Sequence, residues 1–390
     1  MADPFDSDSL GVGPDAVRLT LGDEDVVIAE SWEIKQSILT QPAAFSIRIG
    51  WGDVAAQLIK KYPPRTPFTL SIGNVVQQSG AIDAIRCDAA TGATTLTIRG
   101  RDSLAPLHDA YITADESLQD ATFGDVVAKA LTASGIEDFT LQTSNAANRK
   151  AITGVGVVQI ADPDGGENPQ TQKINRVLQC KVGERQYHHV KKCLDRAGLF
   201  LWASTTLNFF ILSEPNAKQR PAYRIVRQRG ADRNAVNVIS ATFNNDTAGR
   251  YSEAIVYAKG GGKKFGRVTT SGAFVDDEMF NLGFTRPMVL KDATVTNAEQ
   301  AEFYARRKLA ETRRAGWQLS YTLAGHSTPS LIGGQRAVWA VDTVVEVDDE
   351  EFGLQGQFYI ESVEFRRGPE TTTVLTLQRP QDLIFGSDED

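Results

Sequence analysis

The chain has 390 residues, a length that accommodates roughly two to four compact units with buried hydrophobic cores. Hydrophobic residues make up 41% and charged residues 23%, the proportions of a folded globular protein rather than of a disordered chain. The formal net charge of -8 excludes a surface built to wrap nucleic acid, because such surfaces need clustered Lys and Arg to neutralise phosphates.

Several further features predict a soluble, unexported protein. No stretch approaches the roughly 20 apolar residues of a membrane-spanning helix, and the acidic start lacks the basic and apolar segments of an export signal. The three cysteines, Cys87, Cys180 and Cys193, are an odd number at unhelpful spacings. We therefore expect reduced thiols made in a cytosol rather than a disulfide scaffold.

The first part of the chain predicts antiparallel β-structure. Short runs alternate β-branched or apolar residues with polar ones and are separated by Gly, Asn, Asp and Pro turn signals: AVRLTL, DVVIAESWEIKQSI, AAFSIRI, FTLSI, GAIDAIRCDA and TTLTIRGRD. These runs predict a first barrel-like domain over residues 15–104, preceded by a flexible N-terminus at residues 1–14.

Residues 105–222 predict an inserted α+β domain. A first helix has one apolar face and ends at Gly135; that face consists of Phe123, Val126, Val127, Ala130 and Leu131. A second helix is expected to begin near Thr171, after the loop ADPDGGENPQ. The segment ERQYHHVKKCLDRA predicts a helix up to Ala197, followed by the strand pair LFLWAS and LNFFIL.

Residues 223–316 predict strands, a long loop and a helix that link the domains. The strands are RIVRQ, NVISATFNN and EAIVYAKG, and the Gly-rich stretch from Gly260 to Arg286 predicts a long contact loop. After it, Asn297 can cap a helix that carries Glu299 and Glu302 in its first turns and ends at Gly316.

Residues 317–390 return to short alternating strands and echo the first domain. PFTLSIG, GAIDAIR and ATTLTIRGR match VVEVDD, GQFYIESVE and TTTVLTLQR in order and pattern. The echo is consistent with a duplicated β-unit or with the generic repetitiveness of antiparallel strands. We thus expect an α+β protein that is mainly β, with two similar antiparallel β-barrel-like domains, an α+β insertion and a peripheral helical segment.

The sequence offers only weak metal or phosphate candidates. His189 and Cys193 lie one helical turn apart, but their spacing fits no zinc pattern and favours packing instead. Asp162, Asp164 and Gly166 lack the Gly and Glu positions of a calcium loop. The run GGGKKFGR lacks phosphate-loop spacing, and we interpret its Lys263, Lys264 and Arg267 as a flexible basic loop that touches a neighbouring subunit. No cofactor is expected.

Catalytic patterns are equally sparse. The acidic runs at Asp276 and Asp348 could supply paired carboxylates for glycoside cleavage, yet such runs are typical of solvated turns. Four histidines and no GxSxG motif argue against nucleophilic catalysis. The tryptophans lie in or beside strands, where we expect buried core or interface anchors: Trp32, Trp51, Trp202, Trp317 and Trp339.

Four segments together resemble the hub proteins of Mu-like phage tails, which belong with the late-control D proteins and the N-terminal part of type VI secretion spikes. They are RTPFTLSI with GAIDAI, IRGRDSLAPLHDA, NAEQAEFYARRKLAETRRAG and the terminal TTTVLTLQRP. Gly100, Arg101 and Asp102 are the most specific short signal, and Arg101 and Asp102 are candidate interface residues. The loops at 162–172 and 260–286 match nothing in that family.

The resemblance implies a homotrimer whose two barrel-like domains per chain form a pseudo-hexameric ring in the baseplate of a virion tail. Such a hub joins the hexameric tail tube to the trimeric central spike, contacts baseplate wedge or neighbouring tail proteins, and lets DNA pass through its lumen. It would be made in the host bacterial cytoplasm. The alternatives are a tail-associated cell-wall hydrolase and a monomeric carbohydrate-binding β-protein.

Overall fold

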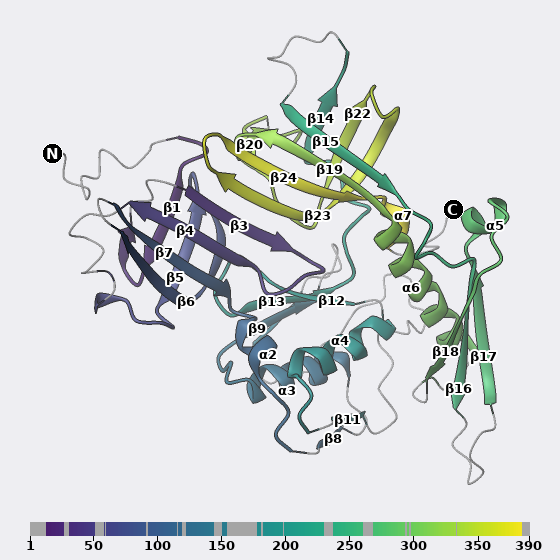
Figure 1. Cartoon of the computed structure of the whole chain (residues 1–390). Coiled ribbons are helices and arrows are strands. Elements are labelled where there is room, and N and C mark those ends of the chain that lie inside the picture. Colours follow the sequence, from purple (N-terminus) through teal and green to yellow (C-terminus); the bar gives the residue numbers. More distant parts are fainter. Residues whose placement is uncertain are drawn as a thin grey trace.

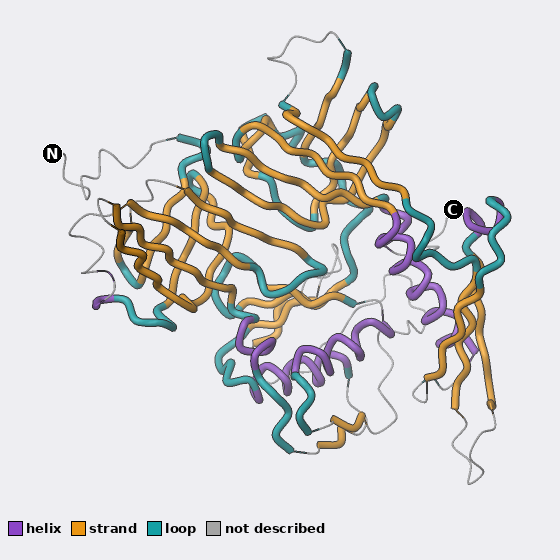
Figure 2. The backbone as a smooth tube through the Cα atoms, viewed as in Figure 1, coloured by secondary structure: helices purple, strands orange, loops and turns teal. Residues whose placement is uncertain are grey.

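The computed structural model describes residues 13–26, 31–50, 58, 60–90, 93–114, 116–118, 122–143, 150–153, 178–180, 182–197, 199–229, 237–259, 268–292, 295, 298–332 and 334–383. Strands dominate these ranges, and the longer helices lie in two separate regions (Figure 2). The protein is therefore α+β and mainly β, as the sequence predicts. Within the described ranges, no helix is long and apolar enough to cross a membrane.

The first β-unit is antiparallel and follows the strands expected from the alternating runs. Its strands are β1 (Val17–Leu21), β2 (Glu24–Val26), β3 (Ser31–Ser37), β4 (Ala44–Gly50), β5 (Pro67–Ile72), β6 (Val75–Ala90) and β7 (Ala93–Asp102). Neighbours in the sheet follow the order β3-β4-β7-β6-β5-β1-β2. Because side chains alternate between faces, Ile34, Ile47 and Ile98 all point to one side and are fully buried.

The second β-unit begins in the middle of the chain and is completed at its end. Its strands are β14 (Tyr223–Arg227), β15 (Val238–Asn245), β19 (Trp317–Ala324), β22 (Thr343–Asp349), β23 (Leu354–Arg367) and β24 (Thr371–Gln378). The small pair β20 (Ser327–Pro329) and β21 (Arg336–Val338) lies between β19 and β22 in the chain. Trp317 and Trp339 are buried here, as expected.

The two β-units share one architecture. The order β3-β4-β7-β6-β5 in the first unit matches β15-β19-β24-β23-β22 in the second. The long strands also carry a bulge at the same place, between Ile82 and Ala84 in β6 and between Ile360 and Ser362 in β23. A shared strand order and a shared bulge go beyond generic alternation, so the echo in the sequence corresponds to a structural repeat.

Neither β-unit closes into a barrel among the described strands, and this corrects the expected pair of barrel-like domains. The units instead join through β3 and β23 into one sheet that runs along an open path from β15 to β2, with β14 and β22 off that path (Figure 1). In each unit one long strand extends beyond its first neighbour. The first half of β6 pairs with β5 and its second half with β7, and the first half of β23 pairs with β22 and its second half with β24. The second half of β23 also pairs with β3, so this edge joins the other unit instead of closing its own.

The inserted α+β domain follows β7. Its elements are α2 (Ala105–Asp109), β8 (Glu116–Leu118), α3 (Phe123–Ala133), β9 (Thr140–Thr143), β10 (Lys150–Thr153), β11 (Leu178–Cys180), α4 (Gln186–Ala197), β12 (Phe200–Ala203) and β13 (Phe209–Ser213). Helices α2, α3 and α4 lie against the sheet β10-β9-β13-β12 (Figure 1). The helices expected to end at Gly135 and at Ala197 are confirmed, whereas residues 171–177 lie outside the described ranges.

A second helical region stands beside the large sheet. It contains β16 (Glu253–Lys259), β17 (Val268–Val275), α5 (Asp277–Asn281), β18 (Pro287–Asp292), α6 (Ala298–Gly316) and α7 (Pro380–Leu383). The predicted contact loop from Gly260 to Arg286 is wrong for its described part, which forms β17 and α5. Gly272 of β17 lies against α6, and a Cβ there would be 2.4 Å from the backbone nitrogen of Glu302. The long helix is confirmed, although its proposed cap Asn297 is not among the described residues.

Candidate functional site

The joint between the two β-units is an antiparallel pairing of β3 with β23. Six residue pairs run from Ser37 opposite Ser362 to Trp32 opposite Arg367. On the core side Ile34 faces Phe365, and both side chains are fully buried. An antiparallel pair supplies backbone hydrogen bonds together with side-chain packing, so this joint fixes the two units relative to each other.

The polar side of the joint is a cluster of charges. Lys35 lies 2.7 Å from Glu33 and 3.5 Å from Glu364, and Arg366 lies 2.5 Å from Glu364. Hydrogen bonds from Glu364 and from Lys35 lower the pKa of Glu33 to about 2, whereas burial raises the pKa of Glu364. The four side chains thus pair across the two units by charge and by hydrogen bonding.

Two buried hydrogen bonds connect the two units on the core side of the same joint. The indole nitrogen of Trp32 donates to Nε2 of His326 over 3.1 Å. Because that nitrogen accepts, the proton of the neutral ring is on Nδ1, which lies 3.1 Å from the hydroxyl of Thr373. Burial lowers the pKa of His326 to about 4, which keeps the ring neutral. Trp32 comes from the first unit, and His326 and Thr373 come from the second.

The corner at Gly100, Arg101 and Asp102 connects the first unit to the inserted domain. Arg101 binds Asp83 of β6, with nitrogen–oxygen distances of 2.6 and 2.9 Å, and Asp109 of α2, with distances of 2.7 and 3.0 Å. Asp102 is buried and accepts hydrogen bonds from the backbone nitrogens of Ala43 and Leu104. Burial raises the pKa of this carboxyl to about 7. Both residues hold the corner within the chain, and their role in an interface stays a prediction.

Gly100 is required by its surroundings. A Cβ at this position would lie 2.6 Å from the ring of Phe45 and 3.0 Å from the carbonyl oxygen of Ala81. The ring of Phe45 in turn packs edge-on against Phe68, with 4.6 Å between centroids. The absence of a side chain at Gly100 therefore leaves room on β7 for the ring of Phe45, which comes from the neighbouring strand β4.

The weak metal candidates His189 and Cys193 both lie on α4 of the inserted domain. Cys193 is buried with Val190 and Leu194 in the core of the inserted domain, and His189 is buried on the same helix, α4. Among the described residues, no three His, Cys, Asp or Glu side chains gather as a metal site would require. The calcium candidates Asp162 and Asp164, and the basic residues Lys263, Lys264 and Arg267, lie outside the described ranges.

One residue in each acidic run is buried, and the expectation of solvated turns is wrong for these two residues, Asp276 and Asp349. Asp276 is buried and lies 3.0 Å from the fully buried Arg250. Asp349 is also fully buried; it accepts a 2.7 Å hydrogen bond from the hydroxyl of Tyr321 and lies 3.5 Å from Arg227. These carboxylates are held by basic and hydroxyl partners rather than facing each other across a cleft.

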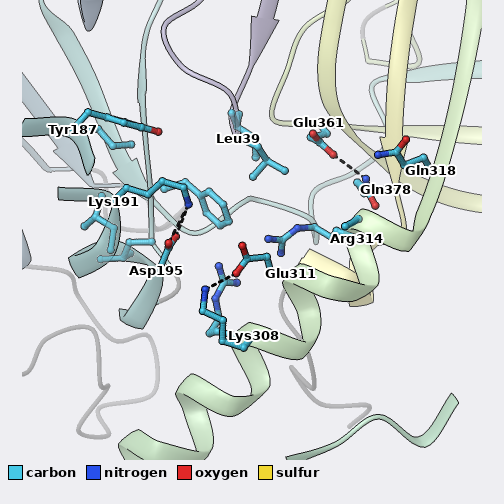
Figure 3. Close-up of a pocket in the computed structure, with 17 residues that line it drawn as sticks. Leu39, Tyr187, Lys191, Asp195, Lys308, Glu311, Arg314, Gln318, Glu361 and Gln378 are labelled. Carbon is cyan, nitrogen blue, oxygen red and sulfur yellow. Dashed lines mark hydrogen bonds and ion pairs between the residues drawn. The ribbon is translucent and has the colours of Figure 1, made fainter. Parts of the chain in front are cut away.

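A cavity of about 250 Å³ lies where α4 and β12 of the inserted domain approach α6 and the large sheet (Figure 3). Its charged side chains pair around the rim: Lys191 with Asp195 at 2.8 Å, and Lys308 with Glu311 at 2.6 Å. Arg307 also lines the cavity and is buried; it donates to the carbonyl of Leu383 over 2.8 Å, and burial lowers its pKa to about 10. The cavity, lined by side chains of both charges, lies between the inserted domain and α6.

The sequence did not predict the pairing of β3 with β23. It also did not predict the Arg250 network, which consists of Arg250 with Asp276 and Glu278. Trp32 was expected to be a buried anchor, which is confirmed along with Trp202, Trp317 and Trp339, whereas Trp51 is outside the described ranges. Nothing near Trp32 in the chain points to His326, because their contact spans 294 positions. Alternation located both strands but could not predict that they pair with each other.

Comparison with solved structures identifies the fold. A 43 kDa tail protein of prophage MuSo2 from Shewanella oneidensis matches with a TM-score of 0.70 and 18% identity, over 94% of this chain and 99% of that chain. A tail protein from Neisseria meningitidis MC58 matches with a TM-score of 0.72 and 20% identity, over 94% and 97%. This chain has the fold of Mu-like prophage tail proteins.

More distant matches extend the fold to secretion machines. A component of the type VI secretion system of E. coli, described as similar to the T4 tail proteins gp27 and gp5, matches with a TM-score of 0.51 and 11% identity, over 93% of this chain and 76% of that one. No protein family profile and no curated protein sequence matches the chain. The resemblance to tail hub and spike proteins is thus confirmed at the level of the fold.

Proposed function

We propose that this protein is a structural hub of a phage tail, a homotrimer that joins the hexameric tail tube to the trimeric central spike. The observation that carries the proposal is the repeat: two β-units with the same strand order, joined side by side in one sheet. Three copies around an axis bring six such units together, which matches a sixfold tube on one side, while the assembly of three copies keeps the threefold symmetry of the spike on the other.

The barrel-like closure expected from the sequence belongs to this assembly in our proposal. Among the described strands of one chain the sheet is open, and we propose that neighbouring copies close it. Tube, spike and baseplate wedge or neighbouring tail proteins are the proposed partners, and the baseplate of the virion tail is the proposed location.

Passage of DNA through the lumen is part of the same proposal. We place the polar side of β3 and β6 on the lumen, where Lys35 pairs with Glu33, and Arg86 lies 2.9 Å from Asp88. Cations that are already paired with carboxylates bind phosphates weakly. We expect no retention of duplex DNA on the assembled protein at physiological salt.

The acidic runs pair with Arg250 and Arg227, and this supports a role other than hydrolysis.

The proposed function is tested by the mass of the purified protein in solution, measured by light scattering, together with an assay for cell-wall hydrolysis. We expect three times the 42.5 kDa chain mass and no cleavage. A stable monomer that cleaves cell-wall material would instead favour the hydrolase, and an inactive monomer that binds glycans would favour the carbohydrate-binding alternative.

A further inference from the structure

Within the chain, β3 pairs with β23, and we call this pairing the filled joint. The repeat contains a second pair of equivalent strand edges, on β15 and β6, that do not pair with each other within the described residues. β15 occupies the place in the second unit that β3 occupies in the first, but among the described strands it pairs only with β19. The second half of β6 occupies the place of the second half of β23, and in the described residues it pairs only with β7. One chain therefore presents both halves of a second joint, on different edges.

The exposed side chains agree with missing partners. In the filled joint Ile34 and Phe365 are fully buried. Their counterparts are Phe243 of β15 and Cys87 of β6; Phe243 is 38% exposed although it points toward the core side, and Cys87 is exposed. Apolar side chains that face the core side of a sheet are left exposed where the next strand is missing.

The repeat also fixes the register. In the first unit a row of paired residues crosses the sheet through Ile82, Gly100, Phe45 and Ile34. In the second unit the equivalent row passes through Ile360, Leu377, Leu319 and Phe243. Both rows start at the shared bulge, so Phe243 takes the place of Ile34. Cys87, three residues after Ala84, takes the place of Phe365, three residues after Ser362.

We propose that β15 of one copy pairs in antiparallel fashion with the Ala84–Ala89 stretch of β6 in the next copy, with Phe243 opposite Cys87. The occupant of each edge is thus a second copy of this chain. This inference rests on the proposed function for the number of copies, but the register follows from the repeat alone. On the polar side the pairing sets Asn244 opposite Arg86 and Thr242 opposite Asp88, which places no like charges together.

The pairing can be tested with a disulfide. Directly opposite residues of an antiparallel pair have Cα atoms roughly 4.5–5.5 Å apart, within the range that a disulfide bridges. The variant Phe243→Cys supplies one partner, and the native Cys87 supplies the other. After oxidation by copper phenanthroline in air, we expect most of the protein to run as a covalent trimer on a non-reducing denaturing gel.

Two matched variants serve as controls. Phe243→Cys combined with Cys87→Ser should lose the crosslinked product, because no thiol then stands opposite position 243. Thr242→Cys with native Cys87 points to the opposite side of the strand, and we expect at least tenfold less crosslinked protein. A crosslink that is equally strong from position 242 would overturn the register.

A second cysteine pair tests the same pairing in case the Phe243→Cys variant does not fold. Ile85 and Asn245 occupy the next position on the same side of the proposed pairing, so Ile85→Cys with Asn245→Cys in a Cys87→Ser background should also crosslink. A trimer by mass in which neither pair crosslinks refutes the pairing and leaves the hub proposal standing. Crosslinked ladders that extend beyond three copies would uphold the pairing and refute the trimer.

Discussion

Replacing Asp276 with Ala should destabilise the protein far more than its surface-like sequence context implies. Arg250 is fully buried, and its guanidinium lies 3.0 Å from Asp276 and 3.1 Å from Glu278. Breaking a buried ion pair from one side typically costs about 3–5 kcal/mol, because the remaining charge stays in a dry environment. The same carboxylate caps α5 by accepting from the backbone nitrogens of Glu278 and Met279, a contribution of about 1 kcal/mol.

Glu278 remains beside Arg250 in this variant and offsets part of the loss, so we expect a total of about 4 kcal/mol in the free energy of unfolding. The measurement is urea unfolding followed by tryptophan fluorescence at a fixed protomer concentration. The matched control is Asp277→Ala, one position further on and exposed, which should stay within about 0.5 kcal/mol. Equal unfolding midpoints for the two variants would refute the role assigned to the buried pair.

Three further changes test the joint, the corner and the second acidic run. The pKa of His326 is lowered to about 4 in the folded protein, against about 6.5 in the unfolded chain. Its contribution to stability is therefore complete above pH 6.5 and is lost as the pH falls toward 4. Between pH 7 and 4.5 the free energy of unfolding of the wild type should fall by about 2 kcal/mol more than that of His326→Gln. Gly100→Ala should lower stability by about 1–3 kcal/mol through its clash with a buried ring, whereas Gly249→Ala, with nothing within 4 Å, should be tolerated; thermal unfolding compares them. Asp349→Ala should cost about 2 kcal/mol because it leaves a buried tyrosine hydroxyl unpaired, while the exposed Glu350→Ala should change neither stability nor oligomeric mass.

Local pattern was sufficient for most individual elements. The alternation in GAIDAIRCDA and TTLTIRGRD located β6 and β7, and apolar spacing located α3 and its end near Gly135. β17 was missed because its described side chains at Ser271, Ala273 and Val275 are exposed and small or isolated, so they carry little alternation. Its inward face, which lies against α6, contains Gly272 and Phe274, and a glycine there removes one apolar residue from the alternating pattern.

The arrangement of the elements could not be predicted in the same way. β3 and β23 pair across most of the chain length, and alternation says which face of a strand is buried without naming its neighbour. The Arg250 network is similarly distributed, since Glu278 also meets Arg313 and Arg379 from other elements. Each acidic run therefore looks like an exposed turn in the sequence, because the basic partners that pair with its buried residue are distant in the chain.

The filled and unfilled joints differ in a way that fits the proposed order of assembly. The joint within the chain forms at the high effective concentration of a single molecule and carries four charged side chains. The open edges must stay soluble before copies meet, and there Arg86 and Asp88 flank Cys87 while Thr242 and Asn244 flank Phe243. Polar residues beside a single apolar one discourage unspecific pairing of sheet edges. Because the two edges are different surfaces, the contact between copies is head-to-tail, and it ends in a closed ring only if the angle set by the intrachain joint recurs between copies.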